Sequence, residues 1–120
     1  MLSYIQNLKA YKNKTAVKSN QESYTYAYLL DQSALVASKL LGDKKDLAEQ
    51  RVAFMINPGV DYVAIQWGIW LAGGVAVPLC ITHPANALEY VLDDTAASII
   101  ITDTEYADIL RPLAVSKGIA

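Results

Sequence analysis

The sequence has little of the residue types that build disulfides, metal sites and catalytic centres. Its 120 residues include one cysteine, Cys80, and one histidine, His83. No intramolecular disulfide can form, and no Cys–His cluster has the spacing of a zinc site. A general base needs an orienting partner, and the sequence around His83 offers none. We therefore expect Cys80 to be a small buried hydrophobe and His83 to mark the entry to a helix.

An excess of charge of one sign is also lacking. Ten basic and twelve acidic residues leave a net charge of −2, and the basic residues are scattered. Nucleic acids and anionic lipids bind to a basic stripe, so neither is an expected partner. The N-terminus does not begin with the basic region and long apolar run of a secretory signal. Together with the single cysteine, this favours a cytoplasmic location.

The longest apolar stretch is interrupted. Between Val63 and Ile81 the only polar side chain is that of Gln66, and this length approaches that of a transmembrane helix. However, Gly73, Gly74 and Pro78 break it, and its second half is β-prone. The stretch therefore predicts a buried helix, a glycine stop and a buried strand, with no membrane span.

Apolar runs and helical patterns alternate along the chain, which is 53% hydrophobic and 18% charged. The N-terminal part predicts a helix over 3–11 with Ser3 as its N-cap, a hairpin of strands 15–18 and 23–25 turning at Ser19-Asn20, and a helix over 26–41 that stops at Gly42. The following part predicts strands over 52–56, 75–79 and 98–101 and helices over 60–71, 85–92 and 102–110. Such alternation is typical of a parallel sheet with right-handed crossovers. The expected fold class is α/β, with a partial parallel sheet, flanking helices and a small N-terminal antiparallel hairpin.

Two helix ends have specific local signals. Thr102 and Glu105 have the spacing of a capping box, in which each side chain bonds a free backbone N–H of the other residue. Pro112 predicts the end of the same helix, because proline removes a helical hydrogen bond.

Several short motifs, in this order, resemble those of the adenylate-forming enzymes, which include acyl- and aryl-CoA synthetases, luciferases and peptide-synthetase adenylation domains. The motifs are Tyr24–Leu29, Arg51–Phe54, the Gly-x-x-x-Ala-Gly-Gly-Val-Ala-Val-Pro-Leu segment that ends at Leu79, His83–Asp94 and Ile99–Thr102. The resemblance covers residues 12–118, and after Pro78 it is similar to the fatty-acyl and malonyl-CoA synthetase branch. Three departures are Tyr28 in place of glutamate, Glu49-Gln50 in place of Gly-Asp, and Trp70 in place of lysine.

The resemblance implies an N-terminal fragment, residues 1–120, of an ATP-dependent, AMP-forming acyl-CoA synthetase. Within it, residues 1–42 form a helix, hairpin and helix, and residues 50–111 alternate strands with helices. The family's phosphate loop, ribose-binding aspartate, hinge and catalytic lysine have no counterpart in this sequence. The resemblance therefore implies no catalytic, cofactor-binding or metal residue here, whereas the parent enzyme would use ATP, Mg²⁺ and coenzyme A. The expected partners are the remainder of the ligase chain and, through exposed apolar surface, further copies.

Candidate sites have structural interpretations beside functional ones. Gly73-Gly74 follows a helix and precedes a strand, the reverse of a phosphate-binding loop. Asn57-Pro58-Gly59 is in the right place for one, but with a single glycine it predicts a turn. Asp93-Asp94 point different ways on a helix and favour a surface role. We expect the tyrosines to pack a small cluster, namely Tyr4, Tyr11, Tyr24, Tyr26 and Tyr28.

Two other classes of protein stay open. One is a free-standing α/β module that binds a protein partner through its apolar face. The other is a small nucleotide-binding domain, which ranks last because no glycine fingerprint is present.

Overall fold

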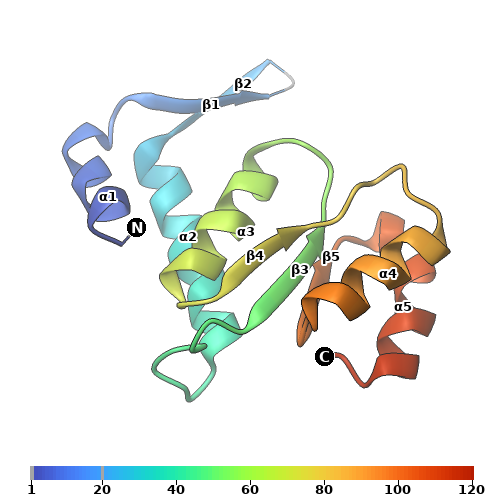
Figure 1. The fold of residues 1–120 in the computed structure, drawn as a ribbon. Coiled ribbons are helices and arrows are strands. Elements are labelled where there is room, and N and C mark those ends of the chain that lie inside the picture. The colour runs from blue at the N-terminus through green and yellow to red at the C-terminus, as the bar shows by residue number, and fades with distance from the viewer. Residues whose placement is uncertain (1, 20) are drawn as a thin grey trace. The chain divides into compact units, whose positions relative to one another are not determined.

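The computed structural model describes residues 2–19 and 21–120, and they fall into two compact units. The first contains residues up to Ala48 together with Pro58–Gly74, and the second contains Glu49–Asn57 together with Val75–Ala120. Figure 1 shows the order of the elements along the chain. The mixed α/β class predicted from the sequence is confirmed, with one parallel sheet and one antiparallel pair.

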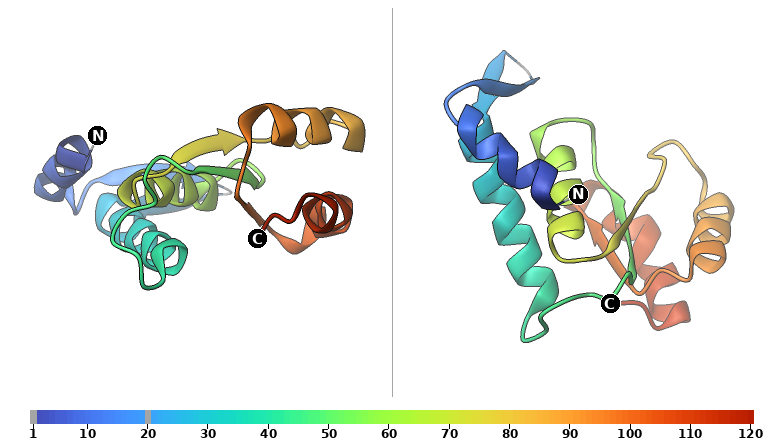
Figure 2. Two further views of the ribbon diagram at one scale, coloured as in Figure 1. Left: turned by 60° about the horizontal axis from the view of Figure 1, so that its bottom comes forward. Right: turned by 60° about the vertical axis from the view of Figure 1, so that its left-hand side comes forward.

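The first unit is built from helices and a hairpin. Its elements are α1 (Leu2–Asn7), the 3₁₀ helix η1 (Leu8–Tyr11), β1 (Thr15–Ser19), β2 (Glu22–Thr25), α2 (Tyr26–Leu41) and α3 (Val60–Leu71). Strands β1 and β2 pair antiparallel, as predicted, although the turn residue Asn20 lies outside the described residues. Helices α2 and α3 lie side by side in all views (Figures 1 and 2).

A close helix crossing joins α2 to α3. Ser33 is fully buried in α2, and its hydroxyl donates to the Leu29 carbonyl at 2.7 Å. A Cβ added to Gly68 of α3 would lie 2.9 Å from the Ser33 carbonyl oxygen and would also meet Val36. The helices can approach this closely because Gly68 has no side chain.

A small apolar core connects this helix pair to the hairpin. Buried Leu29, Val60 and Ala64 pack with half-buried residues of both hairpin strands and of α3, namely Ala16, Val17, Tyr24, Val63 and Trp67. The predicted tyrosine cluster is only partly present. The rings of Tyr24 and Tyr28 lie 5.1 Å apart, whereas Tyr4 and Tyr11 are 64% and 50% exposed.

The first helix differs from its prediction. It begins at Leu2, so Ser3 lies inside the helix and is not its N-cap, and after Asn7 it tightens into η1. Among the side chains of α1 whose burial is described, that of Ile5 is buried, at 2% exposure. Short 3₁₀ segments, which have i→i+3 hydrogen bonds, are common at the ends of α-helices.

The second unit is built around a parallel sheet. Strand β3 (Arg51–Met55) is flanked by β4 (Val75–Pro78) and β5 (Ile99–Thr102) in the order β4-β3-β5, and helices α4 (Ala85–Thr95) and α5 (Thr104–Lys117) belong to the same unit. One core holds them together: Ala53, Met55, Leu79, Leu88, Leu92, Ala97, Leu110 and Leu113. Val52–Met55 of the central strand are buried, whereas every residue of β5 is half-buried.

The double-glycine joint after α3 has the geometry that the sequence predicts. Gly73 has φ +84°, and its N–H donates to the Trp70 carbonyl at 3.0 Å. The Gly74 N–H donates to the Ile69 carbonyl at 2.9 Å, which completes a Schellman motif. A Cβ on Gly73 would collide with the Asp46 carboxylate. Residues 75–78 then form β4, so the predicted helix, stop and strand are confirmed.

The two predictions at α5 are wrong. Thr102 belongs to β5 and donates to the Met55 carbonyl at 3.0 Å, so it is not a helix cap. Asp103 is the cap, and its carboxylate accepts from the N–H groups of Glu105 and Tyr106. The helix also passes through Pro112 and ends at Lys117. The proline ring is exposed while the apolar face of the helix stays in the core, so packing outweighs one lost hydrogen bond.

No helix among the described residues combines the length and the apolar character needed to cross a bilayer. The Val63–Ile81 stretch is divided between α3, the glycine joint and β4, as its interruptions predict.

Candidate functional site

A polar cluster lies where β3 and β5 end. Ligands of open parallel sheets bind beyond the carboxyl ends of the strands, at the point where the strand order reverses. Here β3 has β4 on one side and β5 on the other, so that point lies between β3 and β5. Asn57 follows β3, and Asp103, Glu105 and Tyr106 follow β5.

Hydrogen bonds inside this cluster occupy its polar groups. The Asn57 amide donates from Nδ2 to Glu105 Oε2 at 2.6 Å, and the Tyr106 hydroxyl donates to Asn57 Oδ1. Burial raises the pKa of the Tyr106 hydroxyl, and the carboxylates of Glu105 and Asp103 raise it further, while the bond to Asn57 opposes the shift. Tyr106 therefore remains a neutral donor at neutral pH, and the cluster ties the loop after β3 to the first turn of α5.

The charge of the cluster limits what chemistry it can perform. The residues described there include two carboxylates and no lysine or arginine. Phosphoryl groups of a nucleotide require cations or free backbone N–H groups to balance their charge. The first-turn N–H groups of Glu105 and Tyr106 already bond to Asp103. The hydrogen bonds of the cluster hold the loop after β3 to α5, and its charge does not suit it to bind a triphosphate by itself.

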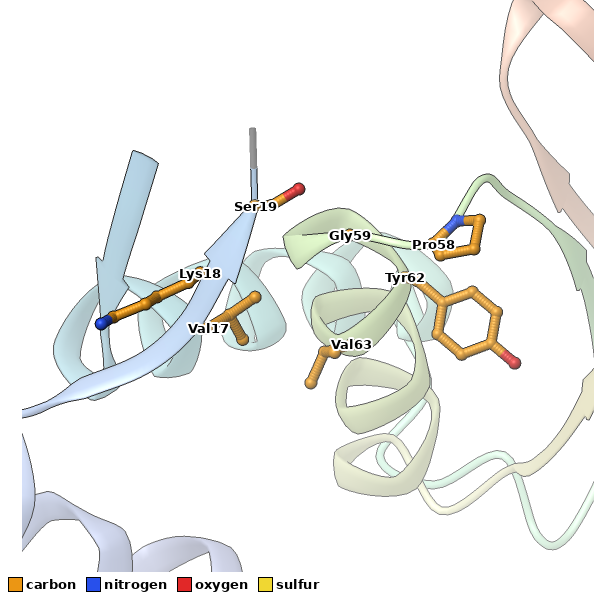
Figure 3. Close-up of a pocket in the computed structure, with 7 residues that line it drawn as sticks. All are labelled: Val17, Lys18, Ser19, Pro58, Gly59, Tyr62 and Val63. Carbon is orange, nitrogen blue, oxygen red and sulfur yellow. The ribbon is translucent and has the colours of Figure 1, made fainter. Parts of the chain in front are cut away.

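An open cavity of about 590 Å³ lies in the first unit, between β1 and the start of α3 (Figure 3). Val17 and Val63 line it from the two sides, and Pro58 and Gly59 form its rim where the predicted turn leads into α3. Figure 3 shows the ammonium group of Lys18 directed away from Pro58. The lining is mostly apolar. It includes Gly59 and the pair Lys18-Ser19, but this pair lies in β1 and not at the start of the helix that follows the glycine, where a phosphate-binding loop has its Lys-Ser/Thr pair.

The remaining candidates from the sequence lie on the surface of the second unit. Cys80 is exposed, so its prediction as a buried hydrophobe is wrong; its Sγ lies 3.1 Å from Thr82 Oγ1. The side-chain hydrogen bond between Cys80 and Thr82 lowers the pKa of the Cys80 thiol. His83 is exposed in the turn before α4, as predicted for a helix-entry residue. Asp93 and Asp94 are exposed, as predicted, and Asp93 pairs with Lys117 of α5.

No group of three or more potential metal-ligating side chains occurs among the residues that the structure describes. The cluster of Asn57 with Tyr106 was missed in the sequence because 49 positions separate the two residues. The sequence could have indicated their proximity in one way. Both residues follow predicted strands, and the carboxyl ends of parallel strands lie at the same edge of a sheet.

The fold and the sequence identify the class of protein. Residues 5–118 match the AMP-binding enzyme family, so the chain belongs to this family, as its motifs predicted. Its solved neighbours share the fold. A benzoate CoA ligase from Burkholderia xenovorans LB400 superposes with a TM-score of 0.82 at 21% identity, over 98% of this chain and 24% of that one. A putative long-chain-fatty-acid CoA ligase from Rhodopseudomonas palustris CGA009 gives 0.81 at 25% identity, over 94% and 28%.

Curated relatives of this chain include malonate–CoA ligases. The mitochondrial malonate–CoA ligase ACSF3 of Mus musculus is 39% identical over 114 residues, which are 92% of this chain and 20% of that protein. The Homo sapiens protein of the same name is 34% identical over 116 residues, again 92% and 20%. The chain thus spans about a fifth of the length of the curated relatives it matches.

Proposed function

We propose that this chain is the N-terminal structural segment of an ATP-dependent, AMP-forming acyl-CoA synthetase. In this reaction a carboxylate attacks the α-phosphate of Mg-ATP to give an acyl-adenylate and pyrophosphate, and the thiol of coenzyme A then displaces AMP. The observation that carries the proposal is the family match over residues 5–118, combined with coverage of only a fifth of the related ligases.

The role that we propose for the segment is to form part of the scaffold, with no catalytic, cofactor-binding or metal residue of its own. Two features support this role. The polar cluster beyond β3 and β5 is acidic and satisfied by its own hydrogen bonds, and the cavity beside β1 is lined mostly by apolar side chains. The residues that hold ATP, Mg²⁺ and coenzyme A would then belong to the remainder of the ligase chain.

Malonate is the first carboxylate to test. The mouse and human relatives are named malonate–CoA ligases, and they share 39% and 34% identity with this chain. A wider role in fatty acid metabolism is a secondary possibility that a substrate panel addresses. These relatives are also named as mitochondrial, so the predicted cytoplasmic location has no support from them.

The test is pyrophosphate release by the full-length gene product, supplied with Mg-ATP, coenzyme A and one carboxylate at a time. We expect malonate to give the fastest release, together with malonyl-CoA detected by mass spectrometry. The 120-residue chain alone serves as the control and should release none. Activity of the isolated chain, or no activity of the full-length protein with any carboxylate of the panel, would contradict the proposal.

We also propose that the isolated chain associates with itself. The half-buried strand β5 leaves apolar surface at the sheet edge, and such surface promotes association between copies. Light scattering should show an average mass that rises with concentration. A strict monomer at high concentration would count against this proposal.

A further inference from the structure

Four of the ten basic residues lie close together in the sequence. They are Lys9, Lys12, Lys14 and Lys18, and residues 1–21 contain no acidic residue. All four side chains are exposed. Four lysines without an acid give this segment a side-chain charge of +4, whereas the whole chain has a net charge of −2. The expectation that no anionic surface binds rests on the scatter of basic residues over the whole chain, and this segment is the exception to that scatter.

Backbone hydrogen bonds hold three of these lysines beside the start of α2. The Ala27 N–H donates to the Lys12 carbonyl at 2.9 Å, and the Tyr26 N–H donates to the Lys14 carbonyl at 3.0 Å. Lys9 lies in η1, and its carbonyl accepts from the Lys12 N–H at 3.3 Å. The three lysines therefore lie together on one ordered part of the surface of the first unit.

An exposed tyrosine belongs to the same surface. Tyr11 is 50% exposed, and the Lys14 ammonium lies 5.5 Å from the centroid of its ring. Lys9 and Lys12 line an open hollow of about 350 Å³. Asp31 also lines this hollow, but among the residues that the structure describes it forms no ion pair with either lysine. We call Lys9, Tyr11, Lys12 and Lys14 the lysine patch.

The residue types of the patch favour a lipid surface over a protein or a nucleic acid. Lysine is depleted in protein–protein interfaces, where arginine is enriched, and the first arginine of this chain is Arg51. Recognition of single phosphate groups with defined geometry also favours the planar fork of arginine. A lysine ammonium is a point charge on a flexible stem, which suits a surface of mobile anionic headgroups. Tyrosine is enriched at the level of the headgroups because its ring is amphipathic.

We propose that the lysine patch binds the surface of an anionic lipid membrane, with the Tyr11 ring at the level of the headgroups. The attraction between lysines and anionic lipids falls off within a Debye length, so the contact is peripheral, reversible and sensitive to salt. This inference goes beyond the proposed function, because neither formation of an acyl-adenylate nor its reaction with a thiol requires a membrane.

Sedimentation of the full-length protein with vesicles tests the proposal. The vesicles consist of phosphatidylcholine alone or of phosphatidylcholine with about 30% phosphatidylserine. At about 0.05 M salt we expect binding to the anionic vesicles to be at least about tenfold stronger than to the neutral ones, and at about 0.5 M salt we expect the difference to disappear. Equal binding to both kinds of vesicle, binding that resists salt, or no binding to either would overturn the proposal.

Two sets of substitutions with the same change of charge locate the contact. The first set removes the charges of the patch and leaves its backbone bonds in place: Lys9→Gln, Lys12→Gln and Lys14→Gln. The control set removes three exposed charges elsewhere in the first unit: Lys39→Gln, Lys44→Gln and Lys45→Gln. We expect the first set to weaken binding to the anionic vesicles at least about tenfold and the control set to change it less than about twofold. Equal losses would show that net charge alone matters and would contradict the proposal.

The tyrosine and a competing polyanion separate a lipid surface from other partners. Tyr11→Ala should weaken binding to the anionic vesicles about threefold, because the ring no longer lies among the headgroups, whereas Tyr90→Ala, at a position that is 70% exposed in α4, should not. Polyuridylate is the competitor. Tighter binding to this polymer than to the anionic vesicles at the same salt concentration would identify a nucleic acid as the partner and overturn the proposal. Pyrophosphate release without vesicles should be the same for all these variants.

Discussion

The two units of this chain are held together in different ways. The first depends on a close crossing of α2 and α3, where Gly68 lets the helices meet over Ser33. The second depends on side-chain packing around a parallel sheet, with its central strand buried and β5 half-buried at the edge. We therefore expect the first unit to be sensitive to added atoms and the second unit to be sensitive to lost atoms.

The largest effect is expected in the core of the second unit. Leu110 of α5 is 2% exposed, so Leu110→Ala should lower the free energy of unfolding by about 3 kcal/mol through lost burial and a cavity. The matched control is Val115→Ala on the same helix, where the side chain is 77% exposed, and it should change little. Urea unfolding followed by circular dichroism measures both, and equal losses would break the comparison.

The helix crossing of the first unit should respond to the opposite change. Gly68→Leu adds a side chain where a Cβ alone would meet Val36 and the Ser33 carbonyl, so we expect a loss of about 2 kcal/mol. Ala34→Leu, at an exposed position on α2, is the control and should be near neutral. The same unfolding experiment applies. A stabilising Gly68→Leu would show that the helices are not in close contact.

The double-glycine joint separates backbone strain from a steric contact. Gly73→Ala should cost roughly 1–2 kcal/mol for the left-handed backbone, and more because its Cβ collides with the Asp46 carboxylate. The control is Gly118→Ala, where the backbone is left-handed (φ 65°, ψ 34°) and nothing lies within 4 Å of an added Cβ. The difference between the two melting temperatures therefore measures the Asp46 contact. No difference would exclude that contact.

The helix caps give a smaller effect in each unit. Asp103 accepts from two N–H groups at the start of α5, whereas Thr25 accepts only from Tyr28 at the start of α2. We expect Asp103→Ala to cost about 1 kcal/mol and Thr25→Ala about half of that, because a carboxylate also interacts with the helix dipole. Thermal unfolding ranks the two variants. A larger loss of stability from Thr25→Ala than from Asp103→Ala would contradict the two hydrogen bonds that identify Asp103 as the cap of α5.

The smallest effect concerns pH and Tyr106. Its pKa is raised in the folded protein, so the stabilisation from its bound proton is complete below pH of about 10 and is lost as pH rises through the folded pKa. Tyr106→Phe should therefore lose less stability between pH 9 and pH 11 than the unmodified chain. Urea titrations at the two pH values measure this. An identical loss in both proteins would mean that burial does not perturb the hydroxyl.

Local signals predicted most of the fold. The glycine stops after α2 and α3 were predicted correctly because a positive φ depends on the residue itself. The continuation of α5 through Pro112 was missed, since it depends on the apolar face of the helix packing into the core. Threonine and aspartate are both favourable N-cap residues, so residue type alone does not distinguish Thr102 from Asp103. Asp103 is the cap because β5 extends through Thr102.

The candidate site was less predictable than the fold. The exposure of Cys80 depends on whether other segments cover its turn, which its own neighbours do not determine. The bond from Tyr106 to Asn57 joins positions 49 residues apart and requires the sheet order to be known first. The family, in contrast, followed from an ordered series of short motifs, each of them weak alone, and the match over residues 5–118 confirms it.

The most direct test of the central claim is a calorimetric titration of Mg-ATP into the folded 120-residue chain. If the segment is a scaffold whose nucleotide-binding residues lie elsewhere in the ligase, the titration should show only the heat of dilution. Saturable binding heat would contradict this account, because it would show that these residues form a nucleotide site by themselves.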